Sequence, residues 1–196
     1  MKKLLLTGFE TFLDFSSNPS EEIILAFDKK KVGPFECHTM VLPVDFEKSP
    51  EILLQALECD EFDAGLSLGL AFSRDFLSLE KIAINLIDDV ERKDNRGKII
   101  EDQKILEKGE NAYFSTLPLK RIQKSLIDEG FKSEISLSAG SFVCNLVMYR
   151  LLHYLNEKPV PAGFIHLPPD KKLKNDSNWS MNRLRDGLNI IIENLD

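Results

Sequence analysis

The chain is short of cysteine, of basic charge and of long apolar runs, and each shortage excludes a class of protein. Its three cysteines are too few and too far apart for a disulfide framework or a zinc site. A formal net charge of -7 leaves no basic excess for binding nucleic acid. The apolar runs are all much shorter than a membrane span. We therefore expect a cytoplasmic protein with reduced thiols and no metal site, binding neither nucleic acid nor a membrane.

What remains is typical of one soluble domain. With 196 residues, 43% of them hydrophobic, the chain is long enough for a full-sized core. No internal repeat and no linker divides it, so we expect a single catalytic domain over 1–196. The two lysine clusters, at 29–31 and 171–174, are interpreted as solvated loops.

Short apolar segments alternate with amphipathic ones along the whole chain. Strands are predicted at 4–7, 37–42, 64–70, 77–86, 134–137 and 162–167, and helices at 18–27, 51–57, 119–127, 144–155 and 181–195. The polar stretch 88–110 is read as a long loop. This order predicts an α/β fold with three layers, α/β/α, in which helices cover both faces of a twisted, mostly parallel sheet.

Residues 138–145, with the sequence SAGSFVCN, contain the strongest chemical signal. Cys144 lies where this small-residue loop turns into an apolar helix. The first turn of a helix presents unpaired N–H groups and the positive end of the dipole, both of which favour an anion such as a thiolate. Neither Cys37 nor Cys59 has such a setting. A cysteine hydrolase is the first hypothesis that the sequence supports.

A nucleophilic cysteine needs a base, and the chain has three histidines from which to choose. His153 follows Cys144 by nine residues on the same helix, on the opposite face and roughly 13 Å away. His38 lies in the middle of a predicted strand. His166 ends a strand, at the edge where open α/β sheets gather their active sites, and is the predicted base.

The acid that would orient the histidine is harder to choose from the residues alone. Glu80 shares a strand face with apolar residues, where a charge is costly unless it is paired. A solvent-facing glutamate at a strand edge is an equally good interpretation. Asp45, Asp94 and Asp170 have similar claims, so these alternatives stay open at this point.

Aromatic residues follow the first predicted strand. Phe9 and Phe12 lie just past its end, and Phe142 lies beside the predicted nucleophile. The segment has neither GxGxxG nor GK[ST], which excludes the common phosphate-binding loops. The phenylalanines favour the wall of an apolar pocket, although such spacing is also typical of a core.

These motifs together resemble the type I pyroglutamyl peptidases, also called pyrrolidone-carboxylate peptidases. The resemblance covers nearly the whole chain. Its landmarks are residues 6–12, 18–19, 42–44, 69–74, 80–85, 94–95, 112–118, 138–145 and 163–166. It implies a cysteine exopeptidase that removes an N-terminal pyroglutamyl residue from peptides, without a cofactor, and that is a homo-oligomer.

The resemblance also assigns roles by motif. It implies that Cys144 is the nucleophile, His166 the base and Glu80 the orienting acid. The substrate-binding residues that it implies are Phe9, Phe12, Asn18, Phe142 and Val143, with the first two holding the lactam ring.

The chain differs from the family pattern around the substrate rim. Phe72-Ser73-Arg74 stands where the family usually has Gly-Gly-Arg. We expect such changes to alter turnover or the tolerance for the residue after the pyroglutamyl group. Two alternatives follow: a related cysteine amidase with a shifted substrate, and a non-catalytic lactam-binding homologue.

Overall fold

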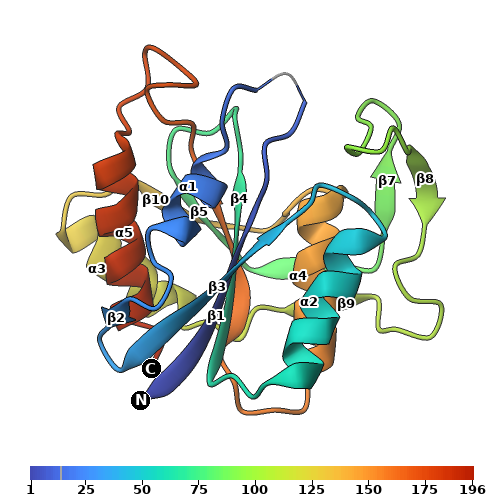
Figure 1. Cartoon of the computed structure of the whole chain (residues 1–196), viewed down its shortest axis with the longest axis horizontal. Helices are drawn as coiled ribbons and strands as arrows, with labels where there is room; N and C mark the ends of the chain where they lie inside the picture. Colours follow the sequence, from blue (N-terminus) through green and yellow to red (C-terminus); the bar gives the residue numbers. More distant parts are fainter. Residues whose placement is uncertain (14) are drawn as a thin grey trace.

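A seven-stranded sheet runs through the computed structural model, which describes residues 1–13 and 15–196 (Figure 1). The strands lie in the order β10-β5-β11-β4-β1-β3-β2. They are β1 (Lys2–Phe9), β2 (Lys31–Val32), β3 (Phe35–Leu42), β4 (Ala64–Leu70), β5 (Leu77–Glu80), β10 (Ser133–Ser136) and β11 (Ala162–Leu167). Within this sheet the pairs β2–β3 and β5–β11 are antiparallel and the others parallel. The prediction of a mostly parallel sheet is confirmed.

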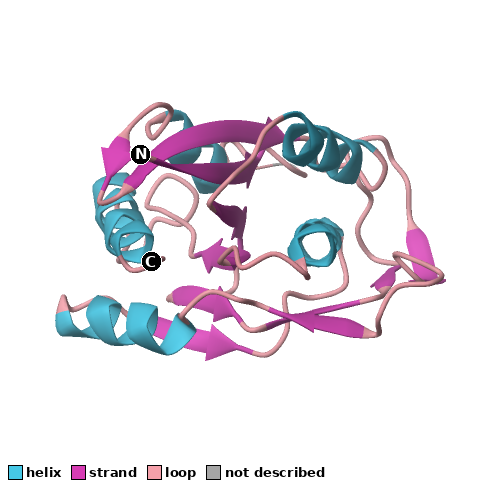
Figure 2. Ribbon diagram, turned by 90° about the horizontal axis from the view of Figure 1, so that it is seen from below, coloured by secondary structure: helices cyan, strands magenta, loops and turns pink. Residues whose placement is uncertain are grey.

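Helices cover both faces of the sheet (Figures 1 and 2). They are α1 (Pro19–Leu25), α2 (Lys48–Cys59), α3 (Leu119–Asp128), α4 (Val143–Leu155) and α5 (Met181–Glu193). Helices α1, α3 and α5 pack on one face, and α2 and α4 pack on the other. In β1, Leu4 and Leu6 point to the first face and Leu5 to the second, as the period of two requires.

Two small antiparallel pairs extend beyond this core. They are β6 (Ile82–Ile84) with β9 (Ala112–Phe114), and β7 (Ile87–Asp89) with β8 (Ile100–Gln103). The single strand expected over 77–86 is therefore wrong in its extent, because β5 joins the main sheet whereas β6 leaves it to pair with β9. The loop expected over 88–110 is wrong in part, since it contains β8. Apolar alternation shows that a segment is extended but does not identify its partner strand.

Local signals explain how two of the helices begin. Helix α1 has Asn18 as its N-cap, whose side chain accepts from the Ser20 N–H at 3.0 Å, and Pro19 at its first position. Gly8 is required where β1 meets this helix, because a Cβ there would lie 2.6 Å from the Ser20 carbonyl oxygen. Helix α4 follows the extended backbone of Phe142, and no side chain in the described ranges caps it. The N–H groups of its first turn are thus left for another partner.

None of the helices in the described ranges has the length and hydropathy that a membrane crossing requires.

Candidate active site

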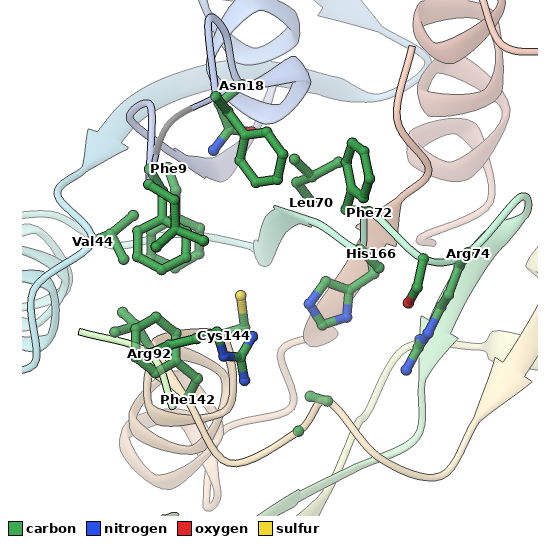
Figure 3. A pocket seen from close by; sticks show the side chains of 18 of the residues that line it. Phe9, Asn18, Val44, Leu70, Phe72, Arg74, Arg92, Phe142, Cys144 and His166 are labelled. Carbon is green, nitrogen blue, oxygen red and sulfur yellow. The ribbon is translucent and has the colours of Figure 1, made fainter. Parts of the chain in front are cut away.

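A cavity of about 380 Å³ opens at the carboxyl ends of the central strands (Figure 3). Phe9 at the end of β1, Leu70 at the end of β4 and His166 near the end of β11 all line it. The start of α4 closes one side, through Val143 and Cys144. This is the edge at which parallel α/β sheets bind their ligands.

A histidine–carboxylate pair lies at the base of the cavity. His166 Nδ1 is 2.8 Å from Glu80 Oε1, and the two residues are 5% and 0% exposed. The register explains the contact: Glu80 on β5 lies opposite Phe164 on the antiparallel strand β11, and His166 is two residues further along the same face. A diagonal neighbour at this spacing is within reach of a long side chain. The structure therefore brings Glu80 and His166 together.

Cys144 is the second residue of α4, and its side chain faces the same cavity as His166 (Figure 3). The following residue fixes this end of the helix. The Asn145 amide accepts from the Ile84 N–H at 3.0 Å and donates to the carbonyls of Ile84 and Leu86 at 2.9 Å each. The partly exposed thiol is thus held at the uncapped end of a buried helix, as the sequence predicted.

The charges of these groups depend on one another. Burial opposes protonation of His166, but the charge and hydrogen bond of Cys144, followed by those of Glu80, outweigh it and raise the pKa of His166 to about 9. Burial likewise opposes ionisation of Glu80, yet His166, Ser136 and Arg74 together hold the pKa of Glu80 below its usual value. At neutral pH the site therefore contains an imidazolium beside the Glu80 carboxylate.

The other candidate acids are used elsewhere. Asp45 accepts from the backbone N–H groups of residues 47 and 48 as α2 begins. Asp94 accepts from those of residues 46, 96 and 98, and Asp170 from that of residue 173. Each carboxylate shapes a loop, and none of the three lines the cavity. Of the four carboxylates that the residues alone left open, Glu80 is the one in contact with His166.

The two remaining histidines lie away from the thiol. His153 is exposed near the end of α4, with its Nδ1 2.8 Å from the Tyr113 hydroxyl. His38 is on β3, 3.5 Å from Glu36 and 3.1 Å from Lys29. Neither lines the cavity, in agreement with the helical geometry argued for His153.

Aromatic rings form one wall of the cavity. Phe12 and Phe142 have ring centroids 5.3 Å apart, and Phe46 packs edge-on behind Phe142 at 5.0 Å. Phe9 and Val143, 3% and 1% exposed, complete this wall beside Cys144. The structure therefore places four of the five predicted substrate-binding residues, Phe9, Phe12, Phe142 and Val143, around one apolar space.

Asn18 also lines the cavity, but its amide is engaged in the first loop. Its Oδ1 accepts from the N–H and hydroxyl of Ser20, and its Nδ2 donates to the Glu10 carbonyl at 2.9 Å. These bonds hold the segment between β1 and α1 against the end of the sheet. The contacts of Asn18 support the loop that supplies Phe9 and Phe12.

Sequence reasoning missed the part played by Arg74. Its guanidinium donates to Glu80 Oε1 at 2.7 Å and to the Ser138 carbonyl at 3.1 Å. One side chain thereby connects the loop after β4, the buried carboxylate and the loop that precedes Cys144. Glu80 was the signal in the sequence that could have led to Arg74. A buried carboxylate requires a cation nearby, and Arg74 supplies it.

Arg92 is a second residue that sequence reasoning missed. Its guanidinium lies 4.7 Å from the centre of the Phe142 ring and is paired with Asp89. Among the described lining residues, Arg74 and Arg92 are the fixed charges, and both are positive. Each is paired with a carboxylate, Arg74 with Glu80 and Arg92 with Asp89, so neither adds a free charge to the apolar wall.

The floor beneath the thiol is tightly packed. A Cβ at Gly69 on β4 would lie 2.8 Å from the Phe164 ring and 3.1 Å from the Cys144 sulfur. Only a glycine at this position lets the sheet approach both groups so closely.

A thiol at a helix start, beside a histidine that is hydrogen-bonded to a buried carboxylate, is the arrangement of a cysteine hydrolase. The profile of the pyroglutamyl peptidase family matches residues 2–194. This chain belongs to the pyroglutamyl peptidase family, as the resemblance in its sequence predicted.

Individual relatives agree with this assignment. The chain is 44% identical to a pyrrolidone-carboxylate peptidase of Halalkalibacterium halodurans, over 87% of this chain and 85% of that protein. The relative from Pyrococcus furiosus is 45% identical over 85% and 80% of the two chains. The solved pyrrolidone carboxyl peptidase of Thermococcus litoralis superposes with a TM-score of 0.95 at 34% identity, covering 100% of this chain and 93% of that one.

Proposed function

We propose that this chain is a cysteine exopeptidase that hydrolyses the amide bond after an N-terminal pyroglutamyl residue. In this proposal Cys144 is the nucleophile, His166 the general acid and base, and Glu80 the group that orients His166. The observation that carries it is the 2.8 Å contact between His166 and Glu80 beside Cys144, at the edge of an apolar cavity. Family membership supplies the substrate class.

The first half of the reaction forms an acyl-enzyme. The Cys144 thiolate attacks the carbonyl carbon of the pyroglutamyl residue, and the electron pair moves to the carbonyl oxygen. We expect the N–H groups at the start of α4 to stabilise that oxyanion. The C–N bond then breaks as His166 gives its proton to the leaving amine, which departs and leaves a thioester on Cys144.

The second half releases the lactam acid. Neutral His166 takes a proton from water, and the resulting hydroxide adds to the thioester carbonyl. Collapse of this intermediate breaks the C–S bond and returns the thiolate beside the imidazolium. Glu80 keeps the imidazole in one orientation and stabilises its charged form throughout.

The apolar lining of the cavity explains why a lactam is the expected substrate. A free N-terminal glutamine or glutamate would bring an ammonium group into a space lined by Phe9, Phe12 and Phe142. An unpaired cation in such a space costs several kcal/mol, to order of magnitude. A pyroglutamyl ring is flat and uncharged, so we expect discrimination of roughly a thousandfold or more.

Pyroglutamyl, glutaminyl and prolyl p-nitroanilides, compared at equal concentration with and without reducing agent, test this proposal. We expect cleavage of the pyroglutamyl compound alone, and loss of that cleavage after treatment with iodoacetamide. Comparable cleavage of the glutaminyl compound would favour a cysteine amidase with a shifted substrate. Binding of a pyroglutamyl ligand without turnover of any compound would favour the non-catalytic homologue.

We further infer that 1–196 acts as one catalytic domain, in the cytoplasm and as a homo-oligomer. One sheet runs through both apolar clusters, which supports a single domain. All three cysteines are free, as in a reducing compartment. Light scattering on the purified chain tests the oligomeric state, and cell fractionation tests the location.

A further inference from the structure

Two phenylalanines form a stacked pair at the mouth of the cavity. The rings of Phe15 and Phe72 have centroids 5.0 Å apart and an interplanar angle of 28°. They come from different loops, Phe15 from the segment between β1 and α1 and Phe72 from the segment after β4. Both line the cavity, and Phe72 is 40% exposed. The pair thus offers an apolar surface that the described residues leave partly exposed.

Backbone contacts fix the position of both rings. The Phe15 N–H donates to the Phe12 carbonyl at 3.4 Å, so the loop that supplies the inner wall also supplies Phe15. The Ala71 N–H donates to the carbonyl of Leu167, the neighbour of His166, at 2.9 Å. The turn that carries Phe72 is closed by an Arg74 N–H bond to the Ala71 carbonyl at 3.0 Å. Phe72 is therefore anchored beside the strand that carries His166.

The two aromatic regions lie on different sides of the thiol. In Figure 3, Phe9 and Phe142 lie with Val44 on one side of Cys144, whereas Phe72 lies on the side of His166. In the proposed reaction His166 protonates the leaving amine, so the leaving residue must lie on this second side. Phe72 then faces the side chain of the residue that follows the pyroglutamyl group.

We propose that the Phe15–Phe72 pair is the binding site for this following residue and that it selects substrates with an aromatic side chain there. This inference rests on the proposed function and names its substrate class more closely. A ring placed against the pair removes apolar surface from water and adds an aromatic contact, whereas a methyl group covers little of it. The neighbouring cations offer no competing attraction, because Arg74 is paired with Glu80 and Arg92 with Asp89.

The test compares pyroglutamyl-phenylalanine amide with pyroglutamyl-alanine amide, with release of the free amino-acid amide measured by chromatography. For the unmodified chain we expect kcat/KM to be about tenfold higher for the phenylalanine compound, a factor typical of small differences in apolar contact. Phe72→Ala should reduce this preference to within about twofold by lowering kcat/KM for the phenylalanine compound alone. Phe72→Tyr keeps the ring and should restore the preference.

Phe114→Ala is the matched control. Phe114 is 65% exposed and lies outside the cavity, so its removal should leave the ratio unchanged. Equal kcat/KM for both compounds in the unmodified chain overturns the inference and leaves the proposed function intact. An equal loss for both compounds in Phe72→Ala also overturns it, because the pair would then stabilise the two loops without selecting the substrate's side chain. Failure to cleave either compound overturns the proposed function as well.

Discussion

The two ends of helix α4 each place a reactive side chain near an aromatic cluster, but with different surroundings. At its start, Cys144 shares a cavity with His166, whose partner is a fully buried carboxylate. Near its end, His153 lies exposed beside Tyr113, whose hydroxyl is its hydrogen-bond partner. A hydrogen-bonded histidine is thus present at both ends, and of the two His166 is the one that lines a cavity with a thiol.

The difference shows that the partner and its burial matter more than the hydrogen bond itself. A buried carboxylate stabilises the imidazolium, because little solvent screens the interaction. An exposed phenol provides no such charge. The start of the helix adds unpaired N–H groups and the positive end of the dipole, whereas the end favours a cation. The same helix therefore favours a thiolate at one end and a positively charged residue at the other.

The largest expected effect comes from removing the thiol. Cys144→Ala should lower kcat/KM for a pyroglutamyl substrate by roughly 10⁴-fold or more, because no nucleophile remains. Stoichiometric iodoacetamide followed by peptide mapping provides the matching measurement on the unmodified chain. Cys144 should be labelled first, since Cys37 is fully buried and burial raises its pKa to about 11. Faster labelling of Cys37 or Cys59 with activity retained would contradict this assignment.

The next largest effect distinguishes the two histidines directly. His166→Ala should reduce turnover by about 10³-fold or more, because both proton transfers lose their carrier. His153→Ala should leave kcat within about twofold and change stability by at most about 1 kcal/mol, as expected for a single exposed hydrogen bond. Steady-state kinetics and thermal melts of both variants make the comparison. If His153→Ala lost turnover and His166→Ala retained it, the assignment of His166 as the base would be wrong.

A smaller effect follows from pH. The folded pKa of His166, about 9, lies above its ordinary value of 6.5, so the imidazolium persists through neutral pH and is lost as pH rises through about 9. We expect kcat/KM to fall about fivefold between pH 9 and pH 10, as the protonated fraction of His166 falls. The stability that this protonation contributes should be fully present below pH 6.5 and lost over the same rise through 9.

Titration of the His166 ring by NMR checks the origin of this shift. Its pKa should decrease in Cys144→Ala, because that side chain is the largest contribution favouring the charged ring. An unchanged pKa in this variant would show that Glu80 alone sets the charge.

The smallest effect concerns Arg74. Arg74→Gln removes a 2.7 Å charged contact from Glu80 while keeping a donor near the Ser138 carbonyl. We expect kcat to decrease several-fold with little change in KM, because the residue positions the carboxylate and does not touch the lactam ring. The pKa of Glu80 should rise, which moves the acid limb of the pH profile to higher pH. Arg74→Lys retains the charge and should recover part of the loss, whereas equal losses in both variants would contradict a charge effect.

The sequence predicted the parts of the fold and site that depend on local pattern. Apolar periodicity identified the strands of the main sheet that carry Phe9 and His166, and the small-residue loop identified the helix start at Cys144. Glu80 could not be chosen from the residues alone, because its contact with His166 depends on β5 running antiparallel to β11. The resemblance to a family made that choice, and in the structure Glu80 contacts His166.

Arg74 was missed for a related reason. Its contacts join three segments that are distant in the chain, and no spacing pattern encodes them. The pairing of β6 with β9 was also missed. It depends on tertiary contacts, such as the hydrogen bond from the Ile84 N–H to Asn145, that no spacing pattern encodes.

The close packing around Gly69 has a consequence for directed evolution. With a new Cβ only 3.1 Å from the sulfur and 2.8 Å from Phe164, saturation mutagenesis at this position should yield inactive clones, although residue 69 takes part in no reaction step. The space for accommodating new substrates lies at the other end of the cavity, where Phe72 is 40% exposed. A library aimed at altered selectivity should therefore diversify the rim loops and leave the strand beneath the thiol unchanged.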